Sequence, residues 1–216
     1  MIKAIFWDFG GVLTTGPFGA FKRFEQENNL PENFIRMVNA THPDTNAWAG
    51  LERGEISLEE FDQAFEQETR RAGHPIGGFQ VLQLIAGDLV PDMVEVLRRC
   101  KQHFRNACLT NNMNIGDHDG DQLAGERAAE FQKVMELFDY VVESSKVGVR
   151  KPDPRFYEMA CEIVNVEPQQ VVFLDDLGVN LKPARAMGMK TIKVTDHGEA
   201  IEELEGVLGI PLAEAR

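Results

Sequence analysis

Several features that mark membrane-bound or secreted proteins are missing from this sequence of 216 residues. No apolar run approaches the roughly 20 residues that a membrane-spanning helix needs, which argues against an integral membrane protein. The chain opens on a core-type apolar stretch, without the basic and then apolar segment of a secretory signal peptide. We therefore expect a globular protein of the cytoplasm.

Cysteine is scarce as well, with three residues in the whole chain. Cys100, Cys108 and Cys161 are widely spaced, and no two of them form the close pair that is typical of a metal site. Cys108 falls in a stretch that resembles a buried strand, and the other two fall within helical patterns. We interpret all three as reduced thiols of the protein core, which agrees with a cytoplasmic location.

Basic residues are also few: 22 lysines and arginines stand against 35 aspartates and glutamates, so the net charge is −13. This balance argues against nucleic acids and anionic membrane surfaces as partners, because both attract a basic face. It would also repel a phosphorylated substrate at long range, so the pocket for one would need a lysine or a bound cation. The sequence leaves the oligomeric state open.

The composition that remains, 43% hydrophobic and 26% charged residues, is typical of a soluble globular protein. Strand-like and helical patterns alternate in residues 1–15 and 90–216, which predicts an α/β core built on a doubly wound (Rossmann-like) parallel sheet. Residues 16–89 hold helical patterns and no convincing strand, which indicates an inserted subdomain. Within this insert we expect several helices: one begins at Pro31, one is opened by a capping box at Ser57, and one covers 79–89.

The most informative stretch is IKAIFWDFGGVLTT at residues 2–15. Its apolar residues run straight into Asp8, so a buried strand would present one carboxylate at the carboxyl edge of the sheet. Gly10 and Gly11 follow, and they would let the backbone turn sharply and approach a ligand closely. Taken alone, the stretch is equally typical of an ordinary exit from a strand.

Two further segments are weak signals by themselves. In NACLTNN, residues 106–112, an apolar run ends on Thr110 and Asn111, whose side chains donate hydrogen bonds suited to phosphate oxygens. A turn or a helix cap would use the same residues. In KPDPRFY, residues 151–157, Pro152 restricts Lys151 to an extended backbone and so would hold its charge in a pocket. Most lysines, however, are solvated surface groups.

The segment VVFLDDLGVN, residues 171–180, gives the strongest single signal. Four apolar residues predict a fully buried strand, and Asp175 and Asp176 follow it directly. Adjacent carboxylates repel each other, so a strand end that keeps both usually has a cation nearby. In an open parallel sheet such strand ends open onto one crevice, so we expect the polar groups of all four segments to meet.

The four motifs DFGGVL, LTNN, KPDP and LDDLGVN resemble those of the haloacid-dehalogenase superfamily of hydrolases, whose members are mostly phosphatases. The similarity covers nearly the whole chain and is closest to the amino-terminal phosphatase domain of soluble epoxide hydrolase. It extends over VVESSKVGVRKPDPRFYEMA and VVFLDDLGVNLKPARAMGMKTIKV, and LERGEISLEEF resembles the cap of that subfamily. The resemblance implies that residues 16–89 form a helical cap over the active site.

The resemblance also implies a mechanism for a small phosphorylated substrate. Asp8 would be the nucleophile and form an aspartyl-phosphate. Mg²⁺ would be held by Asp8, by the backbone carbonyl of Gly10 and by Asp176. Thr110, Asn111 and Gly11 would bind the phosphoryl group, and Lys151 would neutralise charge on it and on Asp8. Asp175 would orient Lys151 or a metal-bound water.

One position departs from the family pattern, which has a second aspartate where this chain has Gly10. In family phosphatases that aspartate protonates the leaving group and activates water, and such help is worth roughly 10²–10⁴-fold. This chain would then depend on good leaving groups, or on a cap residue or water in its place. Two alternatives stay open: a catalytically silent module that binds phosphate or Mg²⁺ as a regulator, and a haloacid dehalogenase, since dehalogenases also lack this aspartate.

Overall fold

The computed structural model describes residues 1–85, 87–111 and 122–212. At its centre five parallel strands form one sheet in the order β3-β2-β1-β4-β5. The strands are β1 (Ala4–Trp7), β2 (Arg105–Thr110), β3 (Tyr140–Glu143), β4 (Val171–Asp175) and β5 (Lys190–Lys193). The order reverses direction at β1, so the chain winds outward both ways from the first strand. The predicted doubly wound α/β core is confirmed.

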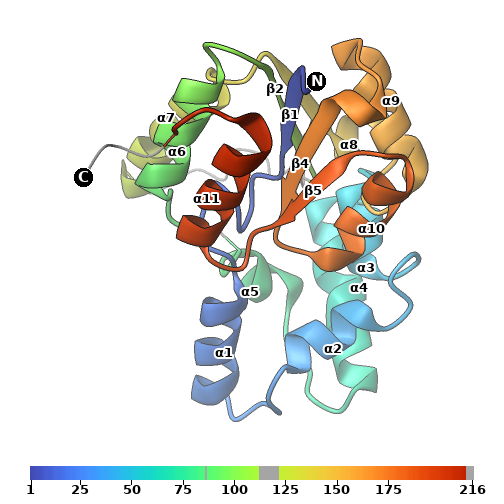
Figure 1. Cartoon of the computed structure of the whole chain (residues 1–216). Coiled ribbons are helices and arrows are strands. Elements are labelled where there is room, and N and C mark those ends of the chain that lie inside the picture. The colour runs from blue at the N-terminus through green and yellow to red at the C-terminus, as the bar shows by residue number, and fades with distance from the viewer. Residues whose placement is uncertain (86, 112–121, 213–216) are drawn as a thin grey trace.

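Helices cover both faces of the sheet (Figure 1). α6 (Pro91–Cys100), α7 (Gln122–Met135) and α11 (His197–Leu208) contribute to one apolar cluster with Ile5 and Trp7 of β1. α9 (Pro154–Val164) and α10 (Gly178–Ala186) pack in a second cluster with Ala4 and Phe6. Alternate residues of β1 therefore point to opposite cores, which is why the strand is apolar throughout.

The inserted segment folds into five helices with an apolar core of their own. They are α1 (Phe18–Glu27), α2 (Phe34–Ala40), α3 (Ala47–Glu52), α4 (Leu58–Arg71) and α5 (Gly78–Leu82), and Figure 1 shows them below the sheet. The predicted capping box at α4 is confirmed, because Ser57 and Glu60 exchange hydrogen bonds of 3.1 and 2.8 Å. We refer to residues 16–89 as the cap; this division stays a prediction.

The chain leaves and returns to the core through two adjacent segments. Thr14 and Leu89 form an isolated antiparallel bridge, and the Thr15 N–H donates to the Asp88 carbonyl at 2.8 Å. The Val90 N–H donates to the Leu13 carbonyl at 2.9 Å. These contacts hold the base of the cap together, and we call residues 13–15 and 88–90 the neck.

Some predicted elements are wrong. The helix expected over 79–89 ends at Leu82, because the following residues must return along the neck. α2 begins at Phe34 rather than at Pro31, because the Glu25 carboxylate accepts hydrogen bonds from the N–H groups of Asn33 and Ile35 at 2.8 and 3.0 Å. Two short helices, α3 and α8 (Ser144–Val147), were not predicted.

All three cysteines are buried and free, and burial raises the pKa of Cys100 to about 12.

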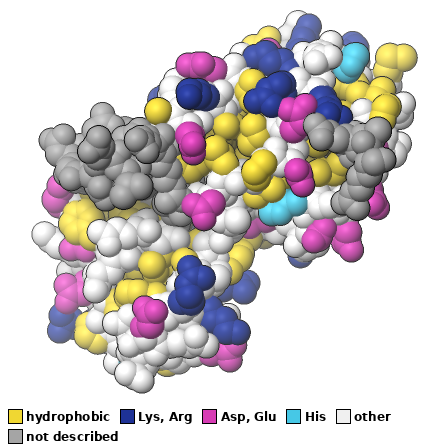
Figure 2. Space-filling view, turned by 90° about the vertical axis from the view of Figure 1, so that its left-hand side faces the viewer, with side chains coloured by type: hydrophobic (Ala, Val, Ile, Leu, Met, Phe, Trp, Pro, Cys, Tyr) yellow, Lys and Arg dark blue, Asp and Glu magenta, His cyan; other side chains and the backbone are white. Residues whose placement is uncertain are grey.

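Within the described ranges, no helix combines the length and the apolar character needed to cross a bilayer. Figure 2 shows acidic and basic side chains interspersed over the visible face. Asn112, the second asparagine of LTNN, lies outside the described residues.

Candidate active site

Three of the predicted site segments meet at the carboxyl edge of the sheet. Trp7 is paired with Cys108 on one side and with Leu174 on the other, so the residues that follow these strands emerge side by side. The Asp8 N–H extends the ladder by donating to the Leu174 carbonyl at 2.9 Å. Its carboxylate is therefore fixed next to the end of β4, where the acidic pair begins.

Lys151 enters the same crevice, but from a different kind of element than expected. It lies in the loop between α8 and α9 and not at a strand end, because β3 already ends at Glu143. Its side chain is only 1% exposed, and Nζ lies 2.9 Å from Asp8 Oδ1 and 2.8 Å from Asp175 Oδ2. Burial alone would lower the pKa of Lys151, but the two carboxylates outweigh it and raise the pKa above its ordinary value.

The Asn111 side chain holds the backbone of Lys151. Its Oδ1 accepts from the Lys151 N–H at 2.8 Å, and its Nδ2 donates to the Lys151 carbonyl at 2.9 Å. Both ends of the Asn111 side-chain amide are therefore engaged. An anion at this segment would be bound by the backbone N–H groups and not by the Asn111 side chain. Thr110 ends β2 beside it and is half-buried.

Asp175 is saturated with hydrogen bonds. Oδ1 accepts from the Leu177 N–H at 2.8 Å and from Asn180 Nδ2 at 3.0 Å. Oδ2 accepts from Lys151 Nζ at 2.8 Å and from Asn180 Nδ2 at 3.1 Å. Asn180 is itself anchored, because its carbonyl accepts from the Tyr157 hydroxyl at 2.6 Å. A carboxylate with this many partners suits an orienting role better than that of a metal ligand.

Asp176 packs directly against Gly11. A Cβ at Gly11 would lie 2.4 Å from Asp176 Oδ2, and the φ of Gly11 is +74°, so only glycine fits there. Burial raises the pKa of the Asp176 carboxyl to about 6, and the neighbouring Asp175 acts in the same direction. Because Gly11 has no side chain, the Asp176 carboxylate can lie directly against the first motif.

Gly10 presents the opposite situation. It is exposed, and a Cβ added there would meet nothing within 4 Å. The position thus has room for a side chain, and its glycine is not required by packing.

The acidic cluster has the chemistry of a divalent-cation site. Oxygens of Asp8, Asp175 and Asp176 all lie within 4.8 Å of one another. Asp8 Oδ1 accepts from Lys151 and from the Phe9 N–H at 2.7 Å. Burial raises the pKa of Asp8 well above its ordinary value, and one lysine does not balance three carboxylates. Hard oxygen donors with uncompensated negative charge fit Mg²⁺.

The cap adds a buried carboxylate that the sequence did not single out. Glu52 ends α3, is 8% exposed and reaches Arg150 and Asn111 of the core. Its segment LERGE has the composition of a solvated charge run, and its partner Arg150 is 98 residues away in the sequence, so no local signal marks it. Trp48, one turn earlier, is partly buried: its ring packs on Phe61 and Phe65 at the edge of the cap core, and its indole N–H donates to Glu52 Oε1 at 3.0 Å.

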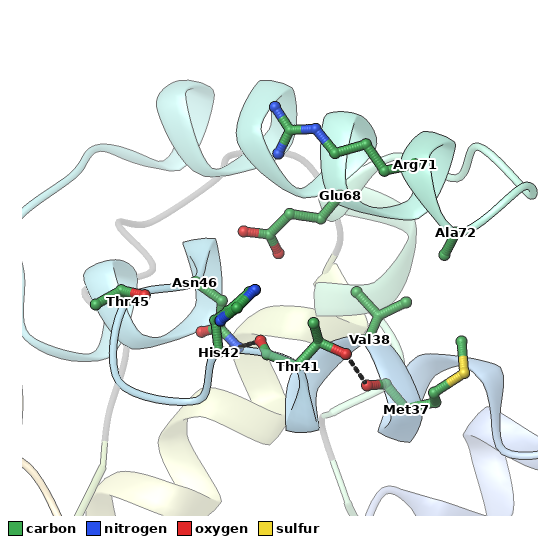
Figure 3. A pocket seen from close by; sticks show the side chains of 9 residues that line it. All are labelled: Met37, Val38, Thr41, His42, Thr45, Asn46, Glu68, Arg71 and Ala72. Carbon is green, nitrogen blue, oxygen red and sulfur yellow. Dashed lines mark hydrogen bonds between the residues drawn. The ribbon is translucent and has the colours of Figure 1, made fainter.

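A hollow of about 410 Å³ lies elsewhere in the cap, between α2 and α4 (Figure 3). It is lined by Met37, Val38, Thr41, His42, Thr45, Asn46, Glu68, Arg71 and Ala72. Glu68 points into it in Figure 3, and its Oε1 already accepts from the Ala47 N–H at 2.8 Å. None of the lining residues belongs to the acidic cluster, so this hollow is separate from the site.

Comparison with known proteins gives a family for the whole arrangement. A family model described as haloacid dehalogenase-like hydrolase matches residues 2–188. Mouse acyl-CoA dehydrogenase family member 10 is 31% identical over 97% of this chain and 19% of its own length. Pig bifunctional epoxide hydrolase 2 is 31% identical over 99% of this chain and 40% of its own length. The chain thus spans two fifths or less of these two relatives.

A relative of similar length also matches. The sesquiterpene phosphatase astK of Aspergillus oryzae is 28% identical over 96% of this chain and 97% of its own. Among solved structures, a haloacid dehalogenase family enzyme of Bacteroides thetaiotaomicron, in complex with magnesium and inorganic phosphate, has a TM-score of 0.61 at 19% identity, over 89% of this chain and 94% of its own. The L-2-haloacid dehalogenase of Xanthobacter autotrophicus has a TM-score of 0.59 at 18% identity, over 99% and 85%. At these identities the structures show a shared fold.

Proposed function

The chain belongs to the family of haloacid dehalogenase-like hydrolases, and from this premise we propose that it is a Mg²⁺-dependent phosphatase. It would hydrolyse a small phosphorylated metabolite through an aspartyl-phosphate. One observation carries the proposal: Lys151 Nζ lies within 3 Å of both Asp8 and Asp175, next to a carboxylate cluster with uncompensated charge. The full-length match to a sesquiterpene phosphatase supports it.

In the proposed reaction Asp8 is the nucleophile. Its carboxylate attacks phosphorus, the bond from phosphorus to the leaving-group oxygen breaks, and that oxygen takes a proton from water. A water molecule then attacks phosphorus, releases phosphate and restores the Asp8 carboxylate. Lys151 lies 2.9 Å from Asp8 Oδ1, where its charge offsets the negative charge of the approaching phosphoryl group.

The other site residues would bind and orient. Asp8, Asp176 and the Gly10 carbonyl would hold Mg²⁺, which supplies positive charge that lets two anions approach each other. Thr110 would donate its hydroxyl to the phosphoryl group, and Asn111 and Gly11 would bind it through their backbone N–H groups. Asp175 would keep Lys151 in place, which agrees with its four hydrogen bonds.

Gly10 shapes the choice of substrate. The chain has no aspartate at this position to protonate the leaving group, so we propose that good leaving groups, such as acyl or anomeric phosphates, are cleaved best. The same glycine is the feature that favours the two alternatives, a silent binding module and a dehalogenase. The acidic pair Asp175 and Asp176 counts against a dehalogenase, because a site that works without metal does not need it.

The test is phosphate release from a panel of phosphorylated metabolites, including acyl and sugar 1-phosphates, with Mg²⁺ and with EDTA. We expect turnover that depends on Mg²⁺ and disappears in Asp8→Asn. Fluoride release from fluoroacetate in EDTA would identify a dehalogenase instead. Binding of Mg²⁺ and phosphate without turnover on any substrate would favour the silent module.

A further inference from the structure

Glu52 connects the cap to the core. It is the last residue of α3, and its two carboxylate oxygens have different partners. Oε1 accepts from the Trp48 indole at 3.0 Å, within the same cap helix. Oε2 forms an ion pair with Arg150 and lies 3.4 Å from Asn111 Nδ2, and both of these residues belong to the core.

Arg150 joins cap and core from the other side. One of its guanidinium nitrogens donates to Glu52 and the other to the backbone carbonyl of Pro43, so both of its bonds end in the cap. The Ser144 hydroxyl donates to the Glu52 carbonyl and adds a third link across the same boundary. Among the described residues, these bonds tie α3 and the segment before it to α8 and the loop that follows α8.

Both core partners of Glu52 lead to Lys151. Arg150 is its neighbour in the chain, and Asn111 holds both its N–H and its carbonyl. Glu52 is therefore linked to Lys151 by two routes: its ion pair with Arg150, the residue that precedes Lys151, and its hydrogen bond with Asn111. The charge of Lys151 also acts on Glu52 directly.

The ion pair between Glu52 and Arg150 is partly shielded from water, with side chains 10% and 16% exposed. Burial raises the pKa of Glu52, and Arg150 opposes this, so the carboxylate is stable there as an ion only with its partner in place. If the cap lifted, both groups would return to water and their attraction would fall sharply.

We propose that Glu52 and Arg150 form a latch between cap and core, and that Glu52 is a positioning residue that fixes Lys151 through Asn111 and Arg150 when the cap is closed. The catalytic part of this inference rests on the proposed phosphatase function. The latch itself is a statement about two side chains and can be tested without turnover.

The variants are Glu52→Gln, Arg150→Gln and the double variant, with Glu55→Gln as the matched control. Glu55 lies three residues further along the cap and forms an exposed ion pair with Arg53 at 2.7 Å. Glutamine keeps the length and hydrogen-bonding capacity of glutamate and removes its charge. The control therefore removes the same charge from the same segment without touching the core.

The first readout is cap seating, measured by acrylamide quenching of Trp48 fluorescence. The chain has two tryptophans, and Trp7 is fully buried in the sheet, so comparison with Trp48→Phe assigns the signal. We expect each single variant to raise the quenching constant of Trp48 about twofold and the double variant to raise it no further, because the pair acts as a unit. Glu55→Gln should behave as the wild type.

The second readout is kinetic. With the substrate that the panel identifies, Glu52→Gln and Arg150→Gln should lower kcat by roughly 10–100-fold, as loss of an orienting partner does. KM should change less, because the phosphoryl ligands remain. The pH profile of kcat should keep its shape, since Glu52 transfers no proton.

Three results would overturn the inference. Quenching of Trp48 that is unchanged in both single variants would rule out the latch. Additive losses in the double variant would show that the two residues act separately. A kcat that collapses together with one limb of the pH profile would make Glu52 a general acid or base instead. A wild type that turns over nothing would refute the proposed function, while the quenching data would still decide the latch.

Discussion

The two sides of the site differ in how tightly they are built. On the lysine side, Lys151 is enclosed by Asp8, Asp175 and Asn111, and each contact is close to 2.9 Å. On the glycine side, Gly10 is exposed and a side chain there would meet nothing. In the proposed reaction the lysine side would therefore manage the negative charge of the phosphoryl group. Nothing at Gly10 manages the proton of the leaving group.

The largest effect should follow from removing the charge of Lys151, on the lysine side of the site. Lys151→Met leaves Asp8 and Asp175 as buried carboxylates without their cation, so we expect loss of about 3–5 kcal/mol in the free energy of unfolding. We also expect kcat to fall by roughly 10²–10³-fold. Urea unfolding and phosphate release measure the two effects.

Lys146→Met is the control for this change, because Lys146 is an exposed lysine of the neighbouring helix α8 and pairs with Glu143 across one helical turn. It should leave both quantities near wild type. Equal damage from the two substitutions would contradict the special position of Lys151.

The second-largest effect should come from adding a side chain at Gly10, on the glycine side of the site. Gly10→Asp places a carboxyl group where the family has its general acid, and the structure has room for it. We expect kcat for substrates with poor leaving groups, such as alkyl phosphates, to rise by about tenfold or more, with little gain for acyl phosphates. Steady-state kinetics on both substrate classes measures this.

Gly10→Asn is the matched control, since asparagine has the shape of aspartate but no proton to exchange. A similar gain from Asn would mean that the side chain acts by binding and not by proton transfer. No gain from Asp would indicate that another group already protonates the leaving oxygen.

Gly11→Ala tests the close approach between the motifs. The new Cβ would lie 2.4 Å from Asp176 Oδ2 at a φ of +74°, so both strain and displacement of the carboxylate are expected. We predict a loss of about 1–3 kcal/mol in the free energy of unfolding, together with weaker Mg²⁺ binding. Thermal unfolding and calorimetric titration with Mg²⁺ measure these.

Gly209→Ala separates the two causes, because Gly209 has a φ of +70° and open space around it. It should lose stability through backbone strain alone and bind Mg²⁺ as the wild type does. If both variants bind Mg²⁺ equally well, the Asp176 carboxylate does not contribute to the metal site.

The smallest effect concerns pH. The pKa of Asp176 is about 6 in the folded protein, above its ordinary value of 3.8, so ionising it costs stability above pH 6 when no metal is bound. That cost shrinks as the pH falls from about 6 and is absent below the ordinary pKa of 3.8. Mg²⁺ requires the ionised form, so the rise in Tm that it causes should be full near pH 8 and shrink as the pH falls through about 6. Calorimetry with and without Mg²⁺ measures this, and Asp176→Asn should reduce the pH dependence near pH 6.

Much of the core could be read from the sequence because its signals are local. An apolar run that ends in Asp8 or in Asp175 and Asp176 marks a buried strand and its last residue at once. The prolines around Lys151 indicated a fixed lysine, although its place in a loop between two helices was not visible. Position along the chain does not reveal from which element a long side chain enters a crevice.

The cap contact was hidden for a different reason. Glu52 is one acidic residue among several charged neighbours, and only the folded chain brings Arg150 to it. The short helices α3 and α8 were missed because four to six residues give no helical period. Pairings between distant segments leave no trace in either segment alone.

The neck has a consequence for how such a protein can change over time. Its two segments, one following β1 and the other leading into α6, run side by side and are joined by their own hydrogen bonds, so the core meets the same short connection whatever lies beyond it. The entropy of closing a loop grows only slowly with its length, so a longer, shorter or unrelated insert would cost the sheet little. Evolution can therefore change the cap, and with it the molecules that the site accepts, while the active-site residues of the core stay the same.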